Sequence, residues 1–224
     1  CTFCSGSGEF AASCTAPIPE QLEQAKYILG KKAQGAKFIA YFQDFTNTYG
    51  AVSRLEPLFL AAMEPDDVVA LSIATRPDCL PEDILRMLSR LRARKPVFVE
   101  LGLQTVHQAS AHYIRRGYPL SVFDDAVQKL HALEIEVIAH QILGLPGETA
   151  EMMAETTRHL GSVHVDGVKL HLLHVLRGTD LAREYADGRI QMLELDAYID
   201  ILEQCLAVLP PDVVIHRLTG DGAK

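Results

Sequence analysis

Two cysteines stand at a spacing that can hold a metal or form a redox bond. Cys1 and Cys4 lie three residues apart in CTFC, ahead of a stretch rich in glycine and serine. Such a pair can be half of a zinc site, a redox-active dithiol or part of an iron–sulfur site. Cys14, Cys79 and Cys205 form no second pair of regular spacing, which disfavours a structural zinc site. A thioredoxin-like pair should open a helix, and the glycines and serines do not predict one.

The cysteine count also bears on the redox compartment. Five cysteines in a chain without a visible secretory signal disfavour a disulfide framework and favour a reducing, cytoplasmic location. Cys79 follows RPD and Cys205 lies on an apolar helix face, so we interpret both as inert thiols.

Charge and hydropathy exclude some partners. The formal net charge is −8, with scattered basic residues, which disfavours a broad nucleic-acid surface. RNA therefore stays open as a substrate but is not indicated by charge. No apolar run reaches the roughly 20 residues that a membrane span needs, so no membrane association is expected.

Polar residues follow six apolar segments along the chain. The segments end in QDFTNTYG, TRPD, ELGLQT, HQILGLPGET, HLLHVLRGT and HRLTGDG. Near-continuous apolar runs suit parallel strands covered on both faces. Because the carboxyl ends of parallel strands lie at one edge of a sheet or barrel, we expect these polar residues to form the site.

The elements that position these residues alternate regularly. The first five strands are expected to start near residues 37, 67, 96, 134 and 166. Intervals of roughly 30 to 40 residues suit one strand–helix unit with its crossover. Without a G-x-G-x-x-G turn, the repetition favours an α/β fold of the (β/α) barrel type over a doubly wound sheet. No linker interrupts it, so we expect a single domain over 1–224.

In its motifs the chain resembles the radical S-adenosylmethionine (SAM) superfamily. Within that superfamily it is similar to the YhcC-like branch, which is related to the radical domain of the elongator catalytic subunit. The motifs that carry the resemblance are CTFC, FIAYFQDFTNTYG, ALSIATRPDCLPEDIL, VELGLQTVH, IRRG, HQILGLPGE, VDGVKLHLLHVLRGT and VVIHRLTGD. Together they span nearly the whole chain in order.

The resemblance implies a partial (β/α)6-type TIM barrel, a [4Fe–4S] cluster and SAM as cofactors. In such enzymes three cysteines hold the cluster, and a 5′-deoxyadenosyl radical made from SAM abstracts hydrogen from a substrate. Cys1 and Cys4 would be the second and third ligands. The first ligand and the first strand would then precede this chain, making it an incomplete core domain at both ends. A reducing partner such as flavodoxin or ferredoxin is also implied.

The resemblance assigns SAM contacts around the methionine part. Gln43, Asp44 and Thr46 occupy the strand end that binds the amino group in relatives, although the family's glycines are absent. Gln104 and Arg116 match polar contacts to the ribose and the methionine carboxylate, and an arginine fork suits a carboxylate.

Other positions match the nucleoside part of SAM. Phe3 resembles the aromatic residue whose backbone meets adenine, and His140 stands where several relatives bind ribose hydroxyls. Leu173 and His174 fall at the strand end that lines adenine. His174 and His216 are further candidates for substrate contacts, whereas strand alternation can turn His171 outward.

Two other classes of function stay open from the residues alone. One is a barrel hydrolase with a metal on strand-end histidines, although no H-x-H occurs. The other is a non-catalytic domain that binds SAM or a partner. The sequence names neither the substrate nor a catalytic residue.

Overall fold

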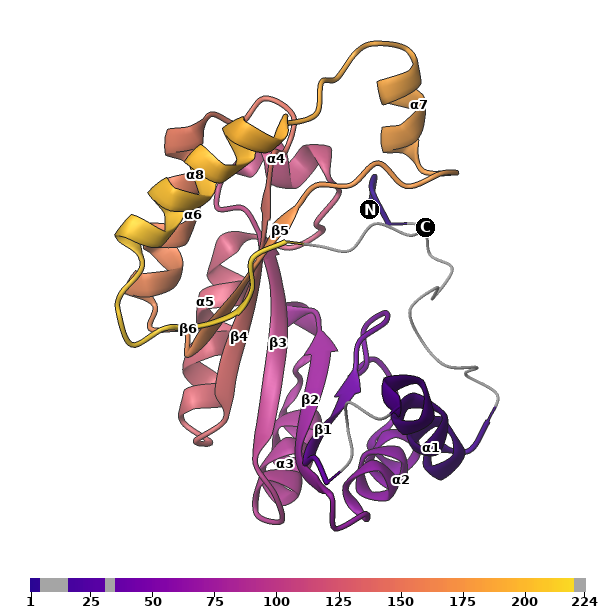
Figure 1. Cartoon of the computed structure of the whole chain (residues 1–224). Helices are drawn as coiled ribbons and strands as arrows, with labels where there is room; N and C mark the ends of the chain where they lie inside the picture. The colour runs from indigo at the N-terminus through magenta and orange to yellow at the C-terminus, as the bar shows by residue number, and fades with distance from the viewer. Residues whose placement is uncertain (5–15, 31–34, 220–224) are drawn as a thin grey trace. The chain divides into compact units, whose positions relative to one another are not determined.

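A computed structural model of the 224-residue chain describes residues 1–4, 16–30 and 35–219. Its strands form one six-stranded sheet in the order β1-β2-β3-β4-β5-β6 (Figure 1). The strands are β1 (Phe38–Phe42), β2 (Val68–Thr75), β3 (Val97–Gln104), β4 (Glu136–Leu143), β5 (Gly167–Leu172) and β6 (Val214–Arg217). All six expected strands are therefore confirmed, in the sequential order of a (β/α) barrel.

Helices alternate with the strands as the sequence predicts. They are α1 (Ile18–Leu29), α2 (Val52–Met63), the short 3-10 helix η2 (Pro77–Cys79), α3 (Glu82–Arg92), α4 (Gln108–Tyr113), α5 (Leu120–His131), α6 (Ala150–Ser162), α7 (Asp180–Ala186) and α8 (Leu195–Val208). None of the helices in the described ranges is long and apolar enough to cross a membrane.

Local sequence explains where representative helices begin and which face they bury. In α3, Ile84, Leu85, Leu88 and Leu91 are buried at helical spacing, with acidic residues in the first turn and basic residues in the last. At α6, the Thr149 side chain accepts a hydrogen bond from the Met152 amide and caps the helix.

The chain divides into two compact units, and boundaries between them fall inside β3, α5 and β4. Unit 1 comprises Cys1–Ser7, Leu101–Val127 and Val137–Lys224, and unit 2 comprises Gly8–Glu100 and Gln128–Glu136. Each unit is described separately below. The expected single core domain over 1–224 stays a prediction.

Unit 2 packs α2 and α3 against β1 and β2. Phe59 of α2 is fully buried and meets Phe42 edge to face at 4.9 Å between ring centroids. On β3, the Glu100 carboxylate is 3% exposed and accepts hydrogen bonds from Ser72 Oγ at 2.7 Å and Tyr41 Oη at 2.8 Å. Burying a carboxylate without hydrogen-bond partners costs free energy, so these two hydroxyl donors explain why Glu100 can be buried in β3.

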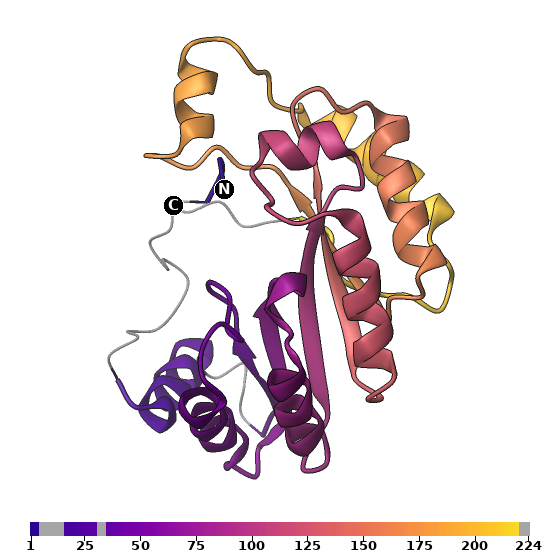
Figure 2. The same ribbon diagram turned by 180° about the vertical axis from the view of Figure 1, so that it is seen from behind.

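Unit 1 covers one face of β4 and β5 with α6 and α8, which lie side by side (Figure 2). Buried Gln141 of β4 donates to the Met153 carbonyl oxygen and accepts from Thr157 Oγ1, which satisfies its amide inside the layer. β4 and β5 are parallel, with His140 opposite Lys169 and Ile142 opposite His171.

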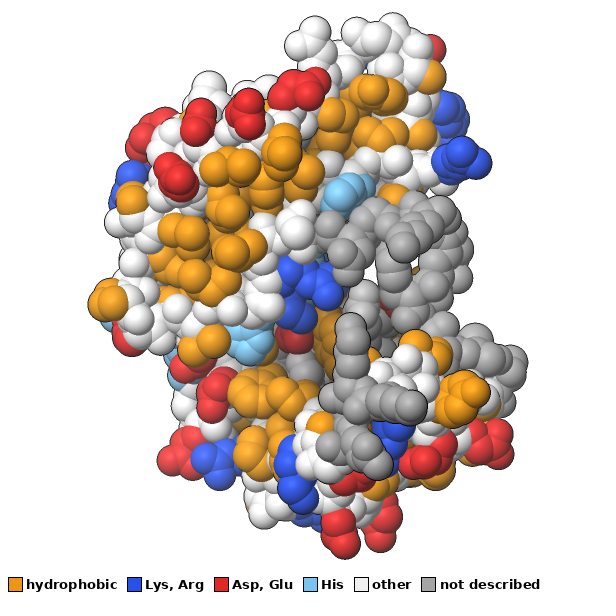
Figure 3. Space-filling model, viewed as in Figure 1, with side chains coloured by type: hydrophobic (Ala, Val, Ile, Leu, Met, Phe, Trp, Pro, Cys, Tyr) orange, Lys and Arg blue, Asp and Glu red, His pale blue; other side chains and the backbone are white. Residues whose placement is uncertain are grey.

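The outer face of α8 is apolar. Hydrophobic side chains gather over this helix in Figure 3, and Leu195 is 70% exposed. β6 next to β5 is also exposed along its whole length.

Candidate cofactor site

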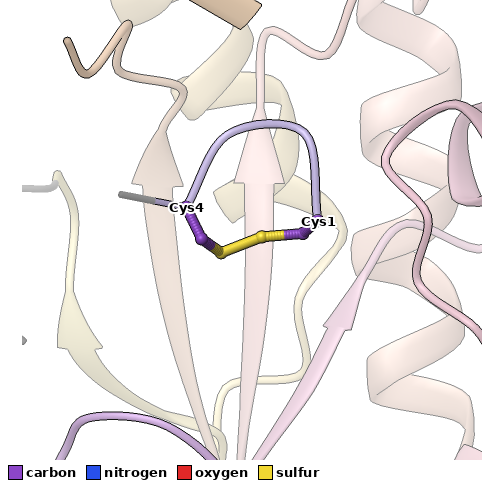
Figure 4. The surroundings of a disulfide bond; sticks show 2 residues. All are labelled: Cys1 and Cys4. Carbon is purple, nitrogen blue, oxygen red and sulfur yellow. A yellow bond between two sulfur atoms is a disulfide. The ribbon is translucent and has the colours of Figure 1, made fainter. Parts of the chain in front are cut away.

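The two N-terminal cysteines face one another across a tight loop. Cys1 and Cys4 form a disulfide in the structure, with their Cα atoms 5.8 Å apart (Figure 4). The sequence analysis left a redox-active dithiol open for this pair, and the structure joins the two sulfurs. The loop turns both exposed side chains to the same side, which lets two thiols oxidise. The same convergence would let both reduced sulfurs approach one metal centre.

The residues between the cysteines anchor this loop. The carbonyl oxygen of Thr2 accepts a 3.0 Å hydrogen bond from the amide of Leu181 in α7, and Thr2 is 3% exposed. Phe3 packs on an apolar cluster of buried side chains, which we call the Phe3 cluster. Its members are Ile114, Ile142, Leu145, Leu173 and Leu181. The structure thus brings Phe3 and Leu173 together, while the two cysteines stay exposed.

Two polar contacts tie α7 to the segment at α4. Tyr113 Oη donates to Glu184 Oε2 at 2.8 Å, and Arg115 Nη1 lies 2.7 Å from Asp180 Oδ2. Burial and the Glu184 carboxylate raise the pKa of Tyr113 to about 12. The sequence analysis did not predict these two contacts. The one related feature visible in the sequence is Thr179, which caps the start of α7.

Arg116 is buried rather than solvated. Its Nε donates to the Tyr118 carbonyl oxygen, and its Nη1 donates to the carbonyl oxygens of Leu103 and Thr105 at the end of β3. Burial lowers the pKa of this guanidinium. Its Nη2 is also buried and has no hydrogen-bond partner. An unpaired donor on a buried cation is costly and fits an anionic ligand.

Gln104 ends β3 in an unusual backbone conformation. The φ of Gln104 is +68°. Its side chain folds back over Gly102, and a Cβ added to Gly102 would lie only 2.7 Å from Gln104 Nε2. The next residue, Thr105, donates from Oγ1 to Glu148 in the turn before α6 at 2.6 Å. Non-glycine residues at positive φ are common at binding sites, and the SAM contact of Gln104 stays a prediction.

Two of the predicted histidines lie on neighbouring strands. The rings of His140 and His171 are 5.1 Å apart. His171 therefore shares the face of His140, and the outward orientation that alternation allowed is wrong. The His216 ring of β6 packs against Gly167 and fills the space that a side chain at that position would need. His174 follows β5 and is half-buried. Both histidines of the pair have interaction partners in the structure.

Unit 2 contains the other predicted SAM residues. The Oδ2 atom of Asp44 is buried without a hydrogen-bond partner, and burial raises the pKa of this carboxyl group. Gln43 beside it is exposed, and Thr46 is half-buried at the wall of a pocket. An unpartnered buried carboxylate oxygen fits a cationic ligand such as an amino group.

No group of three His, Cys, Asp or Glu side chains that could hold a metal occurs among residues 1–4, 16–30 and 35–219. Cys14 lies outside the described residues. Once their disulfide is reduced, Cys1 and Cys4 would fit two positions of the three-thiolate set that the resemblance implies.

The fold and the cysteine loop define an α/β barrel-type protein with a pair of converging cysteines. Comparison with known families identifies it further: the Radical SAM superfamily model matches residues 1–160, and the Radical_SAM C-terminal domain model matches residues 165–224. The chain belongs to the radical SAM superfamily.

Individual relatives place the chain more narrowly. It is 43% identical to YtqA of Bacillus subtilis over 224 residues, covering 99% of this chain and 70% of the relative. It is 31% identical to YhcC of Escherichia coli K12, covering 100% of this chain and 72% of the relative. The archaeal Elp3 structure from Methanocaldococcus infernus superimposes with a TM-score of 0.76 at 21% identity, over 92% of this chain and 52% of that one. The predicted partial barrel is confirmed.

Proposed function

We propose that this protein is an enzyme that binds a [4Fe–4S] cluster through the thiolates of Cys1 and Cys4 and uses SAM to start radical chemistry on a substrate. The observation that carries the proposal is the cysteine loop, because Thr2 and Phe3 anchor it while both cysteines stay exposed. Membership of the radical SAM superfamily supports the same assignment. When bound, the cluster would supply one electron to SAM, and the resulting 5′-deoxyadenosyl radical would abstract a hydrogen atom.

The cysteines must be reduced before they can bind iron. Thiolates are the ligands of iron–sulfur clusters, so the disulfide has to accept two electrons and open. The third thiolate would come from a cysteine other than the four described ones, since Cys79 and Cys205 lack ligand spacing. A cytoplasmic location and a flavodoxin or ferredoxin as electron donor belong to the same proposal.

The family resemblance assigns SAM contacts in each unit, and each set is considered by itself. In unit 2, Asp44 would accept from the methionine amino group, with Gln43 and Thr46 beside it. Asp44 suits that role because its Oδ2 is buried and unpartnered.

In unit 1, Arg116 would use its unpaired Nη2 to bind the methionine carboxylate. Gln104 and His140 would bind the ribose. Phe3, Leu173 and His174 would lie along the adenine. These residues would bind and orient SAM and exclude water, while the cofactors would supply the reactivity.

Anaerobic reconstitution of the full-length protein with iron and sulfide tests the proposal. We expect the visible absorption of an iron–sulfur cluster, and 5′-deoxyadenosine and methionine once SAM and dithionite are added. Cys1→Ala or Cys4→Ala should abolish iron binding, whereas Cys79→Ser and Cys205→Ser should retain it. Cys14→Ser tests whether that residue supplies the third thiolate.

Other results would favour the alternatives. Full iron content in both Cys1→Ala and Cys4→Ala would overturn the ligand assignment. Tight SAM binding without any iron would support a non-catalytic binding domain. Hydrolytic activity with a divalent metal alone would support the barrel hydrolase.

A further inference from the structure

A pocket in unit 2 has no role in the function proposed above, apart from one shared residue, Thr46. It has a volume of about 450 Å³ and lies between the loop after β1 and the segment after β2. Its walls are formed by Phe45, Thr46, Tyr49, Arg76, Asp78 and Cys79. Pockets for small ligands commonly measure about 300 to 1,000 Å³, so a single ring system with substituents fits here.

Hydrogen bonds hold the two pocket segments in place. The Asn47 side-chain amide donates to three backbone carbonyl oxygens at 2.9 to 3.0 Å, and one of them, that of Ala74, belongs to β2. Thr48 is 2% exposed, lies 2.6 Å from Thr75 Oγ1 and donates to the carbonyl oxygen of Cys79 at 2.6 Å. The pocket is therefore formed in advance of any ligand, which lowers the entropic cost of binding.

Two aromatic side chains on the loop after β1 are exposed to solvent. Phe45 is 74% exposed and Tyr49 is 81% exposed. Phe45 also has a φ of +64°, a conformation that is unfavourable for a bulky side chain. Exposed rings on a backbone held by buried hydrogen bonds are characteristic of stacking surfaces for planar ligands.

An ion pair gives the pocket its polar edge. Arg76 donates to both carboxylate oxygens of Asp78, from Nε at 2.9 Å and from Nη2 at 2.7 Å. The carboxylate neutralises the guanidinium, which makes the site a poor match for a phosphate or a carboxylate ligand. It places N–H donors and oxygen acceptors side by side, which suits the mixed donor and acceptor edge of a nucleobase.

We propose that this pocket binds the planar base of a nucleoside or nucleotide, stacked on Phe45 and Tyr49, with Arg76 and Asp78 contacting its polar edge. The base can come from two sources, the adenine of SAM or a separate nucleotide substrate. Binding requires neither iron nor turnover, so its test is independent of the radical chemistry proposed above.

Calorimetric titration of the iron-free, full-length protein with the four ribonucleosides tests the proposal. We expect at least one to bind, and Phe45→Ala and Tyr49→Ala each to weaken binding by about tenfold, as the loss of one stacking ring does. Tyr27→Ala is the matched control because Tyr27 is 87% exposed on α1, outside the pocket, and it should leave affinity unchanged.

Substitutions that conserve size separate stacking from general apolar contact. Phe45→Tyr keeps a ring and should keep affinity, whereas Phe45→Leu keeps apolar bulk and should lose it. Thermal unfolding of each variant verifies that the loop is still folded. Equal affinity in Phe45→Leu, Phe45→Ala and the parent overturns the proposal. So does the absence of binding for all four ribonucleosides, or preference for N-acetyltyrosinamide, which would indicate a peptide side chain.

Competition identifies the source of the base. If saturating SAM displaces the ribonucleoside, and Phe45→Ala weakens both ligands alike, the pocket binds the cofactor's adenine, and the assignment of adenine to Phe3, Leu173 and His174 proposed above is wrong. If the ribonucleoside binds equally well with SAM present, the base belongs to a separate substrate. Both results support a base-binding pocket.

Discussion

The amide of Leu181 donates a hydrogen bond to the carbonyl oxygen of Thr2, which joins α7 to the cysteine loop. These residues are far apart in sequence, so neither signals the contact by itself. Phe3 also packs on the Phe3 cluster, so the loop is held both by the hydrogen bond at Thr2 and by the apolar contact of Phe3. Ligand loops need such support, because a metal site loses affinity when the shell around its ligands is loosened.

The first prediction concerns this support. Phe3→Ala should leave Cys1 and Cys4 in place but loosen the loop, so that a reconstituted iron–sulfur cluster loses iron to a chelator roughly tenfold faster. Phe3→Leu should largely restore retention, since it refills the apolar contact. Phe45→Ala, on an exposed ring of unit 2, is the control. Equal rates of iron loss in Phe3→Ala and the parent would contradict the anchoring role.

A second prediction uses the bond between Tyr113 and Glu184. Tyr113→Phe should lower the free energy of unfolding by about 1 kcal/mol at pH 8. The folded pKa of about 12 exceeds the usual value of 10.0, so this tyrosine's contribution is complete below pH 10 and disappears between pH 10 and 12.

Urea unfolding at pH 8 and pH 11 measures this effect. The difference between Tyr113→Phe and the parent should be smaller at pH 11. Tyr185→Phe serves as the control, because Tyr185 is 51% exposed. A difference that stays constant with pH would show that Tyr113 does not donate to Glu184.

The third prediction separates stability from binding at Asp44. Burial raises the pKa of the Asp44 carboxyl group above its usual value of 3.8. The folded state therefore holds this proton to a higher pH than the unfolded state does. As a result, the stability of the fold falls as the pH rises from 3.8 to the raised pKa. Asp44→Asn should therefore stabilise the protein at pH 7, by about 1 kcal/mol, and remove this pH dependence. The same change should weaken SAM binding.

Thermal unfolding from pH 3 to pH 7 and calorimetry with SAM test both parts. Asp66→Asn is the control, since Asp66 is exposed and lies outside the proposed site. Lower stability in Asp44→Asn would mean that the charged carboxylate is favoured by the fold.

The fourth prediction concerns Arg116. Because its guanidinium donates to three backbone carbonyl oxygens, Arg116→Ala should cost a few kcal/mol of stability as well as SAM affinity. Arg116→Lys keeps a buried donor for those carbonyls but loses the planar fork. It should fold and bind SAM about tenfold to several-hundred-fold more weakly, with iron content unchanged.

Arg115→Ala is the matched control for this change. Arg115 is exposed and pairs with Asp180, so its removal should affect SAM affinity little. If Arg115→Ala weakens SAM binding and Arg116→Lys does not, the carboxylate is bound by the other arginine. If neither does, the carboxylate is bound elsewhere.

The sequence by itself determined the order of strands and helices and the three-residue spacing of Cys1 and Cys4. Those features depend on local periodicity and on spacing along the chain, which are visible without tertiary contacts. The resemblance read from the sequence also predicted that Gln104 and Arg116 contact the same ligand, SAM. Sequence pattern could not distinguish a solvated Arg116 from a buried one, because burial depends on packing around β3.

Only the tertiary structure revealed the features that join distant segments. It placed Leu181 on Thr2, Tyr113 on Glu184 and the ring of His171 beside that of His140. It also showed that Asp44 and Arg116 each have a buried atom without a hydrogen-bond partner among the residues that the structure describes. Such contacts are set by how crossover segments pack, and the free energy of a buried polar group depends on neighbours that no short stretch of sequence contains.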